Sequence, residues 1–173
     1  MVLEILKYPN AKLKKRTACV ERISKEVFKL VDDMIETMLK HDGVGLAANQ
    51  VGSQLRIFVI NSTPMEETPK PIVLINPEII FQNGLIVEEE GCLSFPELYL
   101  KIPRPQEVHV HAKNLYNENI VLEATGLLAR AIMHEIDHLN GILFIERVDN
   151  EMEQEQKKVK EYLINLSHST KIQ

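Results

Sequence analysis

The sequence predicts an α+β fold in which antiparallel strands occupy the middle of the chain and helices flank them. Three observations lead to this prediction. Residues 24–40 and 126–140 carry apolar side chains at helical period, whereas short runs between residues 56 and 124 are rich in β-branched side chains. The links between these runs are too short for helical crossovers, so neighbouring strands are expected to be antiparallel.

The first helix is expected at residues 24–40. Its apolar side chains repeat three and four positions apart and form one stripe, made of Val27, Leu30, Val31, Met34, Ile35, Met38 and Leu39. Ser24 can serve as the N-cap. We expect the helix to end before Gly43.

The strands are expected in short segments separated by polar turns. These segments are RIFVIN (56–61), PIVLINP (71–77), IIFQNGLIV (79–87), EVHVHAKNL (107–115) and NIVLEA (119–124). Asn83-Gly84 lies between two apolar runs, a strong signal for a hairpin within residues 79–87. A polar turn at residues 116–118 predicts a second hairpin between the last two segments.

Two more helices are expected toward the C-terminus. Residues 126–140 return to helical period, and Asn140-Gly141 is a stop signal. Residues 151–166 are acidic in the first turns and basic in the later ones, which suits the helix dipole. The apolar stripe of this terminal helix is Val159, Tyr162, Leu163 and Leu166.

The length of 173 residues fits a single domain over residues 1–173, with residues 151–173 as a C-terminal helix and tail. The chain has 20 Lys and Arg against 25 Asp and Glu, a formal net charge of −5. This mildly acidic balance argues against a protein that coats nucleic acid or an anionic membrane.

The cellular setting follows from the cysteines and the first residues. Two cysteines cannot form a disulfide framework, which indicates a reducing compartment or a special use for one of them. The start carries Glu4, Lys7 and Pro9 without a long apolar segment, and no stretch approaches the ~18 uncharged apolar residues of a membrane helix. We therefore expect a soluble, cytoplasmic protein with no membrane partner and no specific nucleic-acid partner.

The strongest chemical signal is His134-Glu135-Ile136-Asp137-His138. Residues i and i+4 of a helix lie on one face, so the imidazoles of His134 and His138 can bind the same metal ion. Glu135 flanks this face and can reach a water on the metal without being a ligand. This pattern is typical of metal-dependent hydrolases. The alternative is two solvated histidines on an amphipathic helix.

Two histidines need a further ligand, and the residues alone leave the choice open. Glu146 follows at a short distance, and Cys92 lies in a segment expected to be irregular, after a glycine and before a proline. His109 and His111 are better explained as one solvated face of a strand. Cys19 is expected to be a small buried apolar residue, because nothing near it suggests a ligand.

A third cluster, Gly43-Val44-Gly45-Leu46-Ala47-Ala48-Asn49-Gln50, concentrates glycine in a chain with only seven. Glycines allow the backbone to approach another group closely, and Gln50 offers an amide donor. Taken alone, the cluster also fits a helix C-cap followed by a buried loop. It is not a phosphate-binding loop, because no Gly-Lys-Ser/Thr follows.

Together the three clusters resemble a known family. GVGLAANQ (43–50), EGCLS (90–94) and HEIDH (134–138), in this order and at these separations, closely resemble the three motifs of the peptide deformylases. The likeness covers residues 2–149, including the segments LKYPN, IPRP and GILFIERV. Rival hypotheses are another metal-dependent amidase or peptidase, and a non-catalytic protein with a structural metal, which would need a fourth protein ligand.

The resemblance implies a fold, an activity and a metal. The family fold is α+β, with antiparallel sheets around a central metal-binding helix and with N-terminal and C-terminal helices. The family removes the formyl group from the initiator methionine of nascent polypeptides and releases formate. Its metal ligands fall on Cys92, His134 and His138, and its catalytic acid/base on Glu135. One divalent ion per chain is implied, natively Fe²⁺, with Zn²⁺, Ni²⁺ or Co²⁺ as substitutes.

The resemblance also assigns residues around the substrate. The oxyanion donors would be the Gln50 side chain and the Leu93 backbone N–H, and Gly45 and Gly91 fall where members bind the substrate backbone. Many members have an arginine where this chain has Tyr99, which affects how the distal end of the substrate is held. The implied partners are N-formylmethionyl nascent peptides.

The helical spacing places a pocket beside the metal. Leu127, Arg130 and Ala131 precede His134 by seven, four and three residues and therefore share its face. With Val44, the two apolar residues could wall a slot for methionine, although core packing explains them nearly as well. Arg130 is expected at the pocket rim or on the substrate backbone.

Two predictions outside the pocket concern charged residues. Asp137 and Arg104 could form an ion pair that supports the site, or both could be solvated surface residues. Residues 157–160, KKVK, could contact ribosomal RNA transiently, although lysines on a terminal helix are more often only solvated.

Overall fold

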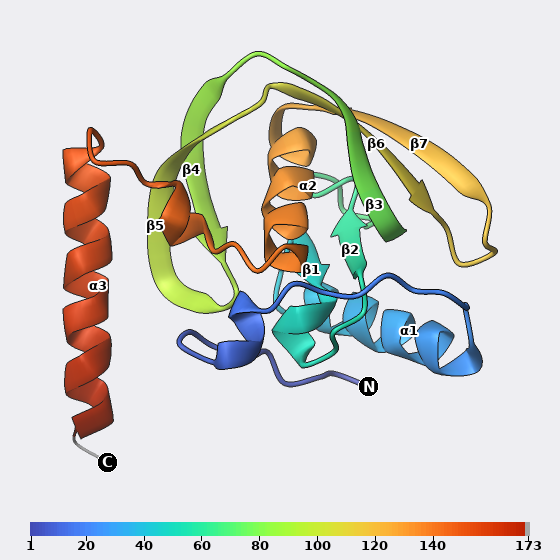
Figure 1. The fold of residues 1–173 in the computed structure, drawn as a ribbon, viewed down its shortest axis with the longest axis horizontal. Helices are drawn as coiled ribbons and strands as arrows, with labels where there is room; N and C mark the ends of the chain where they lie inside the picture. The colour runs from blue at the N-terminus through green and yellow to red at the C-terminus, as the bar shows by residue number, and fades with distance from the viewer. Residues whose placement is uncertain (172–173) are drawn as a thin grey trace.

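The computed structural model describes residues 1–171 and has the predicted α+β architecture (Figure 1). The helices are α1 (Lys25–Lys40), α2 (Gly126–Leu139) and α3 (Glu153–Lys171), with short 3₁₀ helices η1 (Ala11–Lys14), η2 (Ala48–Val51) and η3 (Phe144–Arg147). The strands are β1 (Gly45–Ala47), β2 (Ile57–Asn61), β3 (Pro71–Asn83), β4 (Ile86–Cys92), β5 (Phe95–Arg104), β6 (Glu107–Lys113) and β7 (Asn119–Thr125).

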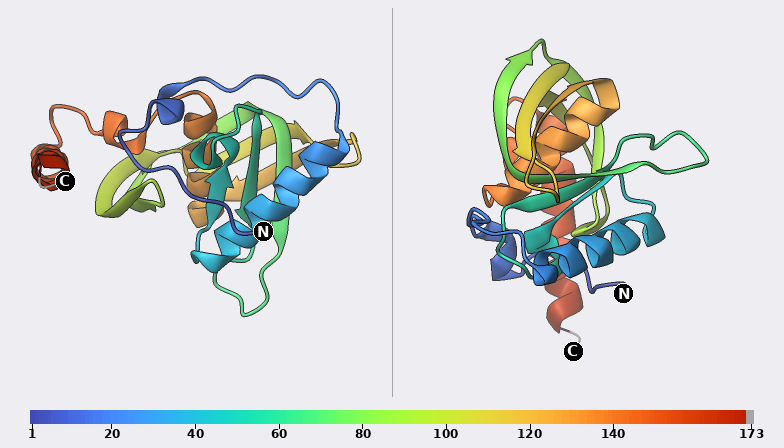
Figure 2. Two further views of the ribbon diagram at one scale, coloured as in Figure 1. Left: turned by 90° about the horizontal axis from the view of Figure 1, so that it is seen from below. Right: turned by 90° about the vertical axis from the view of Figure 1, so that its right-hand side faces the viewer.

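A five-stranded antiparallel sheet with the order β1-β2-β3-β6-β7 forms the centre of the fold. Because side chains alternate along a strand, Phe58 and Ile60 of β2 pack in the cluster that includes α2, and Ile57 and Val59 pack in the cluster that includes α1. The two helices therefore cover opposite faces of the sheet (Figure 2). This packing fixes α2, the helix with the two motif histidines.

The hairpin predicted at Asn83-Gly84 is wrong. β3 pairs with β2 and β6, whereas β4 pairs with β5 in a separate two-stranded sheet. Gly84 has a φ of 73° and lies at the corner where the chain leaves one sheet for the other. The Gln106 N–H donates to the Asn83 carbonyl at 3.0 Å, so the returning chain makes the same corner beside it. The chain therefore forms no tight hairpin here. The β3–β6 pair continues around this corner into the β4–β5 pair, which we call the β4–β5 ribbon and which lies across from α2.

The helical predictions are confirmed, as is the hairpin between β6 and β7. Ser24 occupies the N-cap of α1, but its side chain makes no capping hydrogen bond. α2 ends at its C-cap Asn140, followed by Gly141 with a φ of 72°. The GVGLAANQ segment, which could have been a simple buried loop, forms β1 and η2 at the edge of the sheet.

α3 stands beside the β4–β5 ribbon at one end of the molecule (Figures 1 and 2). It begins two residues later than predicted, and its predicted apolar stripe is half-buried. Glu155 is buried and accepts a hydrogen bond from the Lys101 N–H at 2.8 Å. Residues 172–173 of the predicted tail lie outside the described part of the chain. Within that part, none of the helices combines the length and the apolar character needed to span a membrane.

Candidate metal centre

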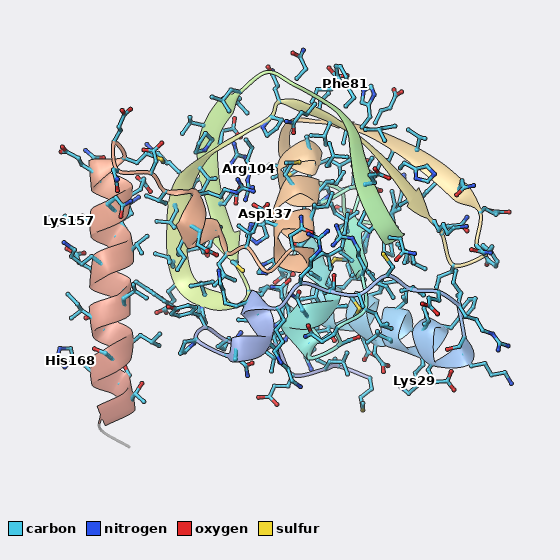
Figure 3. The ribbon with its side chains drawn as sticks, viewed as in Figure 1. Lys29, Phe81, Arg104, Asp137, Lys157 and His168 are labelled. Atoms are coloured by element: carbon cyan, nitrogen blue, oxygen red, sulfur yellow. The ribbon has the colours of Figure 1, made fainter. Side chains whose placement is uncertain are left out.

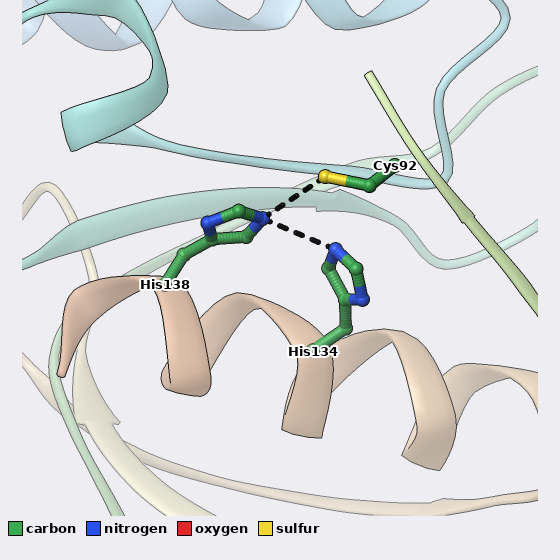
Figure 4. A group of neighbouring side chains, drawn as sticks. All are labelled: Cys92, His134 and His138. Atoms are coloured by element: carbon green, nitrogen blue, oxygen red, sulfur yellow. Dashed lines mark hydrogen bonds between the residues drawn. The ribbon is translucent and has the colours of Figure 1, made fainter. Parts of the chain in front are cut away.

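Three side chains from two elements meet beside the sheet (Figure 4). His134 and His138 lie one turn apart on α2, and Cys92 is the last residue of β4. The Nε2 atom of His138 lies 3.1 Å from Nε2 of His134 and 3.3 Å from Sγ of Cys92. These ligand atoms all lie within 4.8 Å of one another, and no other such cluster of His, Cys, Asp or Glu occurs among residues 1–171. Cys92 is thus the third residue that the fold brings to the two histidines.

Buried Glu90 orients the first histidine. Its Oε2 lies 3.0 Å from Nδ1 of His134. Burial by itself would raise the pKa of Glu90, but hydrogen bonds from His134 and Arg104 outweigh it and lower the pKa to about 2. Because an ionised carboxylate only accepts, Nδ1 of His134 must carry the proton. Its Nε2 is then free to bind a metal.

A chain of ion pairs, buried except at Arg147, holds Glu90 in place. Arg104 donates through Nε to Glu90 at 2.6 Å and through Nη1 to Asp137 at 2.6 Å. Arg130 donates to Glu90 at 2.9 Å, and Arg147 donates through Nε to Asp137 at 2.9 Å. Arg104 and Asp137 lie between α2 and the β4–β5 ribbon (Figure 3). The predicted Arg104–Asp137 ion pair is therefore confirmed, and neither residue is solvated.

Arg130 spans the two strands of the β4–β5 ribbon. Besides Glu90, its guanidinium binds the carbonyl oxygens of Ile86 at 2.9 Å and Ile102 at 2.7 Å. Its side chain borders the pocket but is almost fully buried. Most of its donors therefore already have protein acceptors. Its expected contact with the substrate stays a prediction.

Glu135 lies next to both histidines and faces the pocket. The side chain is buried, and its Oε2 has no hydrogen-bond partner among residues 1–171. Burial raises the pKa of Glu135 to about 7. A Cβ added to Gly45 would lie 2.7 Å from Glu135 Oε1, so only glycine allows β1 to lie this close to the carboxylate. A carboxylate with this pKa and a free oxygen is suited to taking up and returning a proton.

Gln50 and Leu93 border the same pocket. The Oε1 atom of Gln50 accepts a hydrogen bond from the Ala47 N–H at 2.9 Å, which fixes the orientation of the amide. Its Nε2 then donates to Ser94 Oγ at 3.2 Å and lies 3.8 Å from Cys92 Sγ. Leu93 is in the two-residue link between β4 and β5. An amide donor and a backbone turn thus lie beside the Cys92 sulfur.

The pocket has a volume of about 530 Å³. Its lining includes every residue predicted to contact substrate, namely Val44, Gly45, Gly91, Leu127, Arg130 and Ala131, together with Tyr99. The ring of Tyr99 lies over Gly91, where an added Cβ would be 2.8 Å from Cε1. Lys7, His41 and Asp42 also line the pocket, although the sequence did not single them out as pocket residues.

The donor set fits a catalytic divalent metal. A thiolate and two imidazoles bind first-row ions such as Fe²⁺ and Zn²⁺, and three protein ligands leave a position for water or substrate. Burial lowers the pKa of His138 well below its usual value, and the nearby charges of His134 and Arg104 lower it further. This favours the neutral imidazole that a ligand requires. A closed structural site would need a fourth protein ligand, which the cluster does not contain.

Comparison with known proteins identifies the family of this chain. The family model described as polypeptide deformylase matches residues 2–154. The chain belongs to the peptide deformylase family. The resemblance based on three motifs is thus confirmed, together with the α+β fold, and the activity is removal of the N-formyl group from the initiator methionine of nascent polypeptides.

Individual relatives cover most of the chain. The peptide deformylase of Thermodesulfovibrio yellowstonii is 48% identical over 147 residues, which are 85% of this chain and 89% of the relative. The crystal structure of a Legionella pneumophila peptide deformylase matches 96% of this chain and 98% of its own, at 34% identity and a TM-score of 0.84. The Synechococcus elongatus peptide deformylase, solved in complex with actinonin, matches 91% of this chain and 88% of its own, at 40% identity and a TM-score of 0.83.

The other residues considered as metal ligands lie away from the cluster of Cys92, His134 and His138. Glu146 pairs with Lys14 at 2.6 Å, and His109 pairs with Glu107 at 2.9 Å. Cys19 was expected to be buried, and this is wrong because its side chain is exposed. It belongs to an extended segment that joins the body through backbone hydrogen bonds, including Ala18 N–H to the Gln54 carbonyl at 2.8 Å.

The sequence analysis did not identify Glu90 as the residue that orients His134. One signal could have found it, because residues two apart in a strand face the same side and Glu90 precedes Cys92 by two. The run Glu88-Glu89-Glu90 gave no indication of which acid is buried. Only the packing of the ribbon on α2 distinguishes Glu90, which is buried, from its two exposed neighbours.

Proposed function

We propose that Cys92, His134 and His138 hold one divalent ion, natively Fe²⁺, and that Zn²⁺, Ni²⁺ or Co²⁺ can replace it. The convergence of the thiolate and two Nε2 atoms beside a buried carboxylate carries this proposal. When bound, such an ion supplies Lewis acidity, which lowers the pKa of a water toward ~7 and polarises the formyl carbonyl. The softness of the thiolate favours Fe²⁺ or Zn²⁺ over hard ions such as Mg²⁺.

Glu135 acts as general base and then as general acid. Its carboxylate takes a proton from the attacking water as the new bond forms at the formyl carbon. It then returns the proton to the nitrogen of methionine as the carbon–nitrogen bond breaks, which leaves formate and a free amino terminus. Its burial and its unpartnered oxygen support this role, because a proton carrier needs a pKa near the working pH and a free acceptor.

Gln50 and Leu93 stabilise the charge that develops on the formyl oxygen. Gln50 and Leu93 both line the pocket, and each carries an N–H donor. The amide of Gln50 is preorganised, because Oε1 is held by the Ala47 N–H at 2.9 Å and cannot exchange places with Nε2 without losing that bond. Preorganised donors of this kind contribute roughly 10²- to 10³-fold to turnover.

The rest of the pocket selects the substrate. Val44, Leu127 and Ala131 provide apolar surface for the unbranched methionine side chain, and Gly45 and Gly91 let the substrate backbone approach closely. We assign Arg130 to substrate binding, because it lies on the same face of α2 as His134 and lines the pocket. The exposed ring of Tyr99 contacts the distal part of the peptide.

Replacement of Glu135 by alanine tests this mechanism. The variant is expected to keep its metal and to lose about 10²- to 10⁴-fold in kcat for formate release from a formyl-Met peptide. Glu89→Ala is the matched control, because Glu89 lines the same pocket but is exposed. A proportional loss of metal and activity in Glu135→Ala would instead identify Glu135 as a ligand.

Anaerobic purification with metal analysis tests the identity of the ion. We expect the iron form to be the most active and to lose its activity in air, with oxidation of Cys92, because a soft thiolate beside an oxidisable metal is vulnerable. Nickel or cobalt should slow this inactivation. Mass spectrometry of the air-inactivated protein decides the point, since oxidation confined to Cys19 would remove Cys92 from the site.

We infer that the reaction takes place in the cytoplasm, where formylated nascent chains arise. Lys157, Lys158 and Lys160 on α3 are exposed, and Lys157 points away from the body of the protein (Figure 3). We assign these lysines a transient contact with ribosomal RNA. Cosedimentation with ribosomes should weaken in the triple Lys→Glu variant and should weaken in wild type as salt rises, whereas unchanged binding in the variant would refute this contact.

A further inference from the structure

A short N-terminal segment ties Gln50 to the turn that contains Leu93, the two groups proposed above to stabilise the formyl oxygen. We name residues 6–8 the N-terminal strap. The Leu6 N–H donates to the Gln50 carbonyl at 2.7 Å, and the Tyr8 N–H donates to the Ser94 carbonyl at 2.9 Å. Between them, Nζ of Lys7 donates to the Leu93 carbonyl at 2.6 Å. The strap thus binds the backbone of Gln50 and of the turn that contains Leu93.

The turn at Leu93 needs such support. It links Cys92 to Phe95 between β4 and β5, and the strand register shifts between Gly91 and Cys92. Peptide groups in an irregular turn are not fixed by a regular strand ladder and can rotate. The carbonyl of Leu93 belongs to the peptide plane that follows the one with its N–H, and the two planes meet at the Leu93 α-carbon. Holding the carbonyl therefore anchors this α-carbon and reduces the freedom of the turn that carries the N–H.

Lys7 lines the pocket and binds a backbone carbonyl rather than an acid. Its side chain is exposed, and the acids Asp42, Glu89 and Glu97 line the same pocket. Within residues 1–171, however, Lys7 forms no ion pair, and its hydrogen bond goes to the Leu93 carbonyl. A charged donor at 2.6 Å makes a stronger hydrogen bond than a neutral one. A lysine that served only as a solvated surface charge would have no need of this carbonyl.

We propose that Lys7 is a positioning residue for the deformylation reaction, acting through the Leu93 N–H and supported by the strap. This inference rests on the oxyanion role proposed for Gln50 and Leu93. The strap holds the two donors at a fixed separation, and Lys7 fixes the peptide plane that follows Leu93. Preorganisation of this kind lowers the activation barrier without changing the affinity for the ground state.

Lys7→Met tests the proposal, because methionine has a similar shape but no charge and no donor. We expect kcat for a formyl-Met peptide to fall about tenfold, less than the roughly 10²- to 10³-fold that follows loss of an oxyanion donor itself. KM, metal content and melting temperature should stay near wild type. Lys7→Arg, which restores a charged donor, should recover most of the loss. Lys15→Met is the matched control, because the Lys15 side chain forms no ion pair within residues 1–171.

A thioformyl-Met peptide separates positioning from simple tethering. In this peptide sulfur replaces the formyl oxygen. Because sulfur accepts hydrogen bonds weakly, the Gln50 and Leu93 donors should contribute less to kcat. The penalty of Lys7→Met should therefore shrink to about twofold on the thioformyl peptide. Equal penalties on the two substrates would show that Lys7 acts only as a structural tether and would overturn the proposal. If Lys7→Met folds poorly, Lys7→Gln gives a second variant, and a loss that only follows the folded fraction would overturn it as well.

Gln50→Leu, measured alongside, distinguishes this proposal from the proposed function. If Gln50→Leu lowers kcat while Lys7→Met behaves like Lys15→Met, the oxyanion role stands and the role of Lys7 is wrong. If Gln50→Leu leaves kcat unchanged, the oxyanion role of Gln50 fails, and a loss in Lys7→Met that shrinks on the thioformyl peptide would support the Leu93 N–H alone. Loss of kcat in both variants, with both penalties reduced on the thioformyl peptide, supports the two together.

Discussion

Replacement of Gly45 by alanine is predicted to reduce turnover by displacing the Glu135 carboxylate. The added Cβ would lie 2.7 Å from Oε1 and 2.8 Å from Cγ of Glu135. Ordinary van der Waals contact begins at 3.4 Å, so the carboxylate must retreat by roughly 0.7 Å. Glu135 lines the pocket, so its carboxylate can make room by moving away from β1, and it then leaves its place beside the ligands.

The expected effect is large for activity and small for stability. A misplacement near 1 Å costs about 10²-fold in rate, and a general base contributes about 10²- to 10⁴-fold, so kcat should fall about 30- to 100-fold. Gly45 is not among the glycines with positive φ, so its backbone accepts alanine. The free energy of unfolding should therefore change by less than about 1 kcal/mol.

Formate release, metal analysis and urea unfolding together check this prediction. Gly126→Ala is the control, because Gly126 has a φ of 58° and an added Cβ would meet nothing within 4 Å. It should lose about 1–2 kcal/mol of stability through backbone strain and keep its kcat. A Gly45→Ala enzyme with wild-type kcat, or one that loses its metal, would refute the reasoning.

Three further predictions follow from the pocket and its support. Glu90→Gln should weaken metal affinity about 10- to 100-fold in a chelator titration, because a neutral amide orients His134 less strongly, and unchanged affinity would contradict this. Gly91→Ala should push the Tyr99 ring off the rim, since the new Cβ would lie 2.8 Å from Cε1. KM should then rise more for formyl tetrapeptides than for formyl-Met amide, and equal changes for both would count against it. Formyl-Met peptides should be cleaved far faster than acetyl-Met peptides, because a methyl group must fit between the ligands and β1; similar rates would exclude a tight acyl site.

The helices were predictable because their signal is local. The stripe of α1 and the spacing of His134 and His138 on α2 depend only on helical period, and both occur as expected. The Asn83-Gly84 hairpin failed because a turn signal does not say which strands pair. β3 and β4 each find a different neighbour, since the corner at Gly84 lets β3 complete the central sheet while β4 and β5 cover α2.

The sequence by itself determined the metal-binding character of the site and, through three motifs, the family. His134, Glu135 and His138 are set by spacing along one helix, so no tertiary information was needed to place them on one face. Cys92 lies 46 residues before His138. From the residues alone it was one candidate ligand among several, because nothing local connects a strand end to a distant helix.

Only the tertiary structure decided how the site is held. Burial of Glu90, its ion pairs with Arg104 and Arg130, and the approach of Gly45 to Glu135 all arise where separate elements pack together. The bond from Lys7 to Leu93 likewise joins residues 86 positions apart. Periodicity reports which face of an element is apolar, but it carries no information about which other element covers that face. That choice depends on the packing of the whole chain, and the support of the catalytic groups depends on it too.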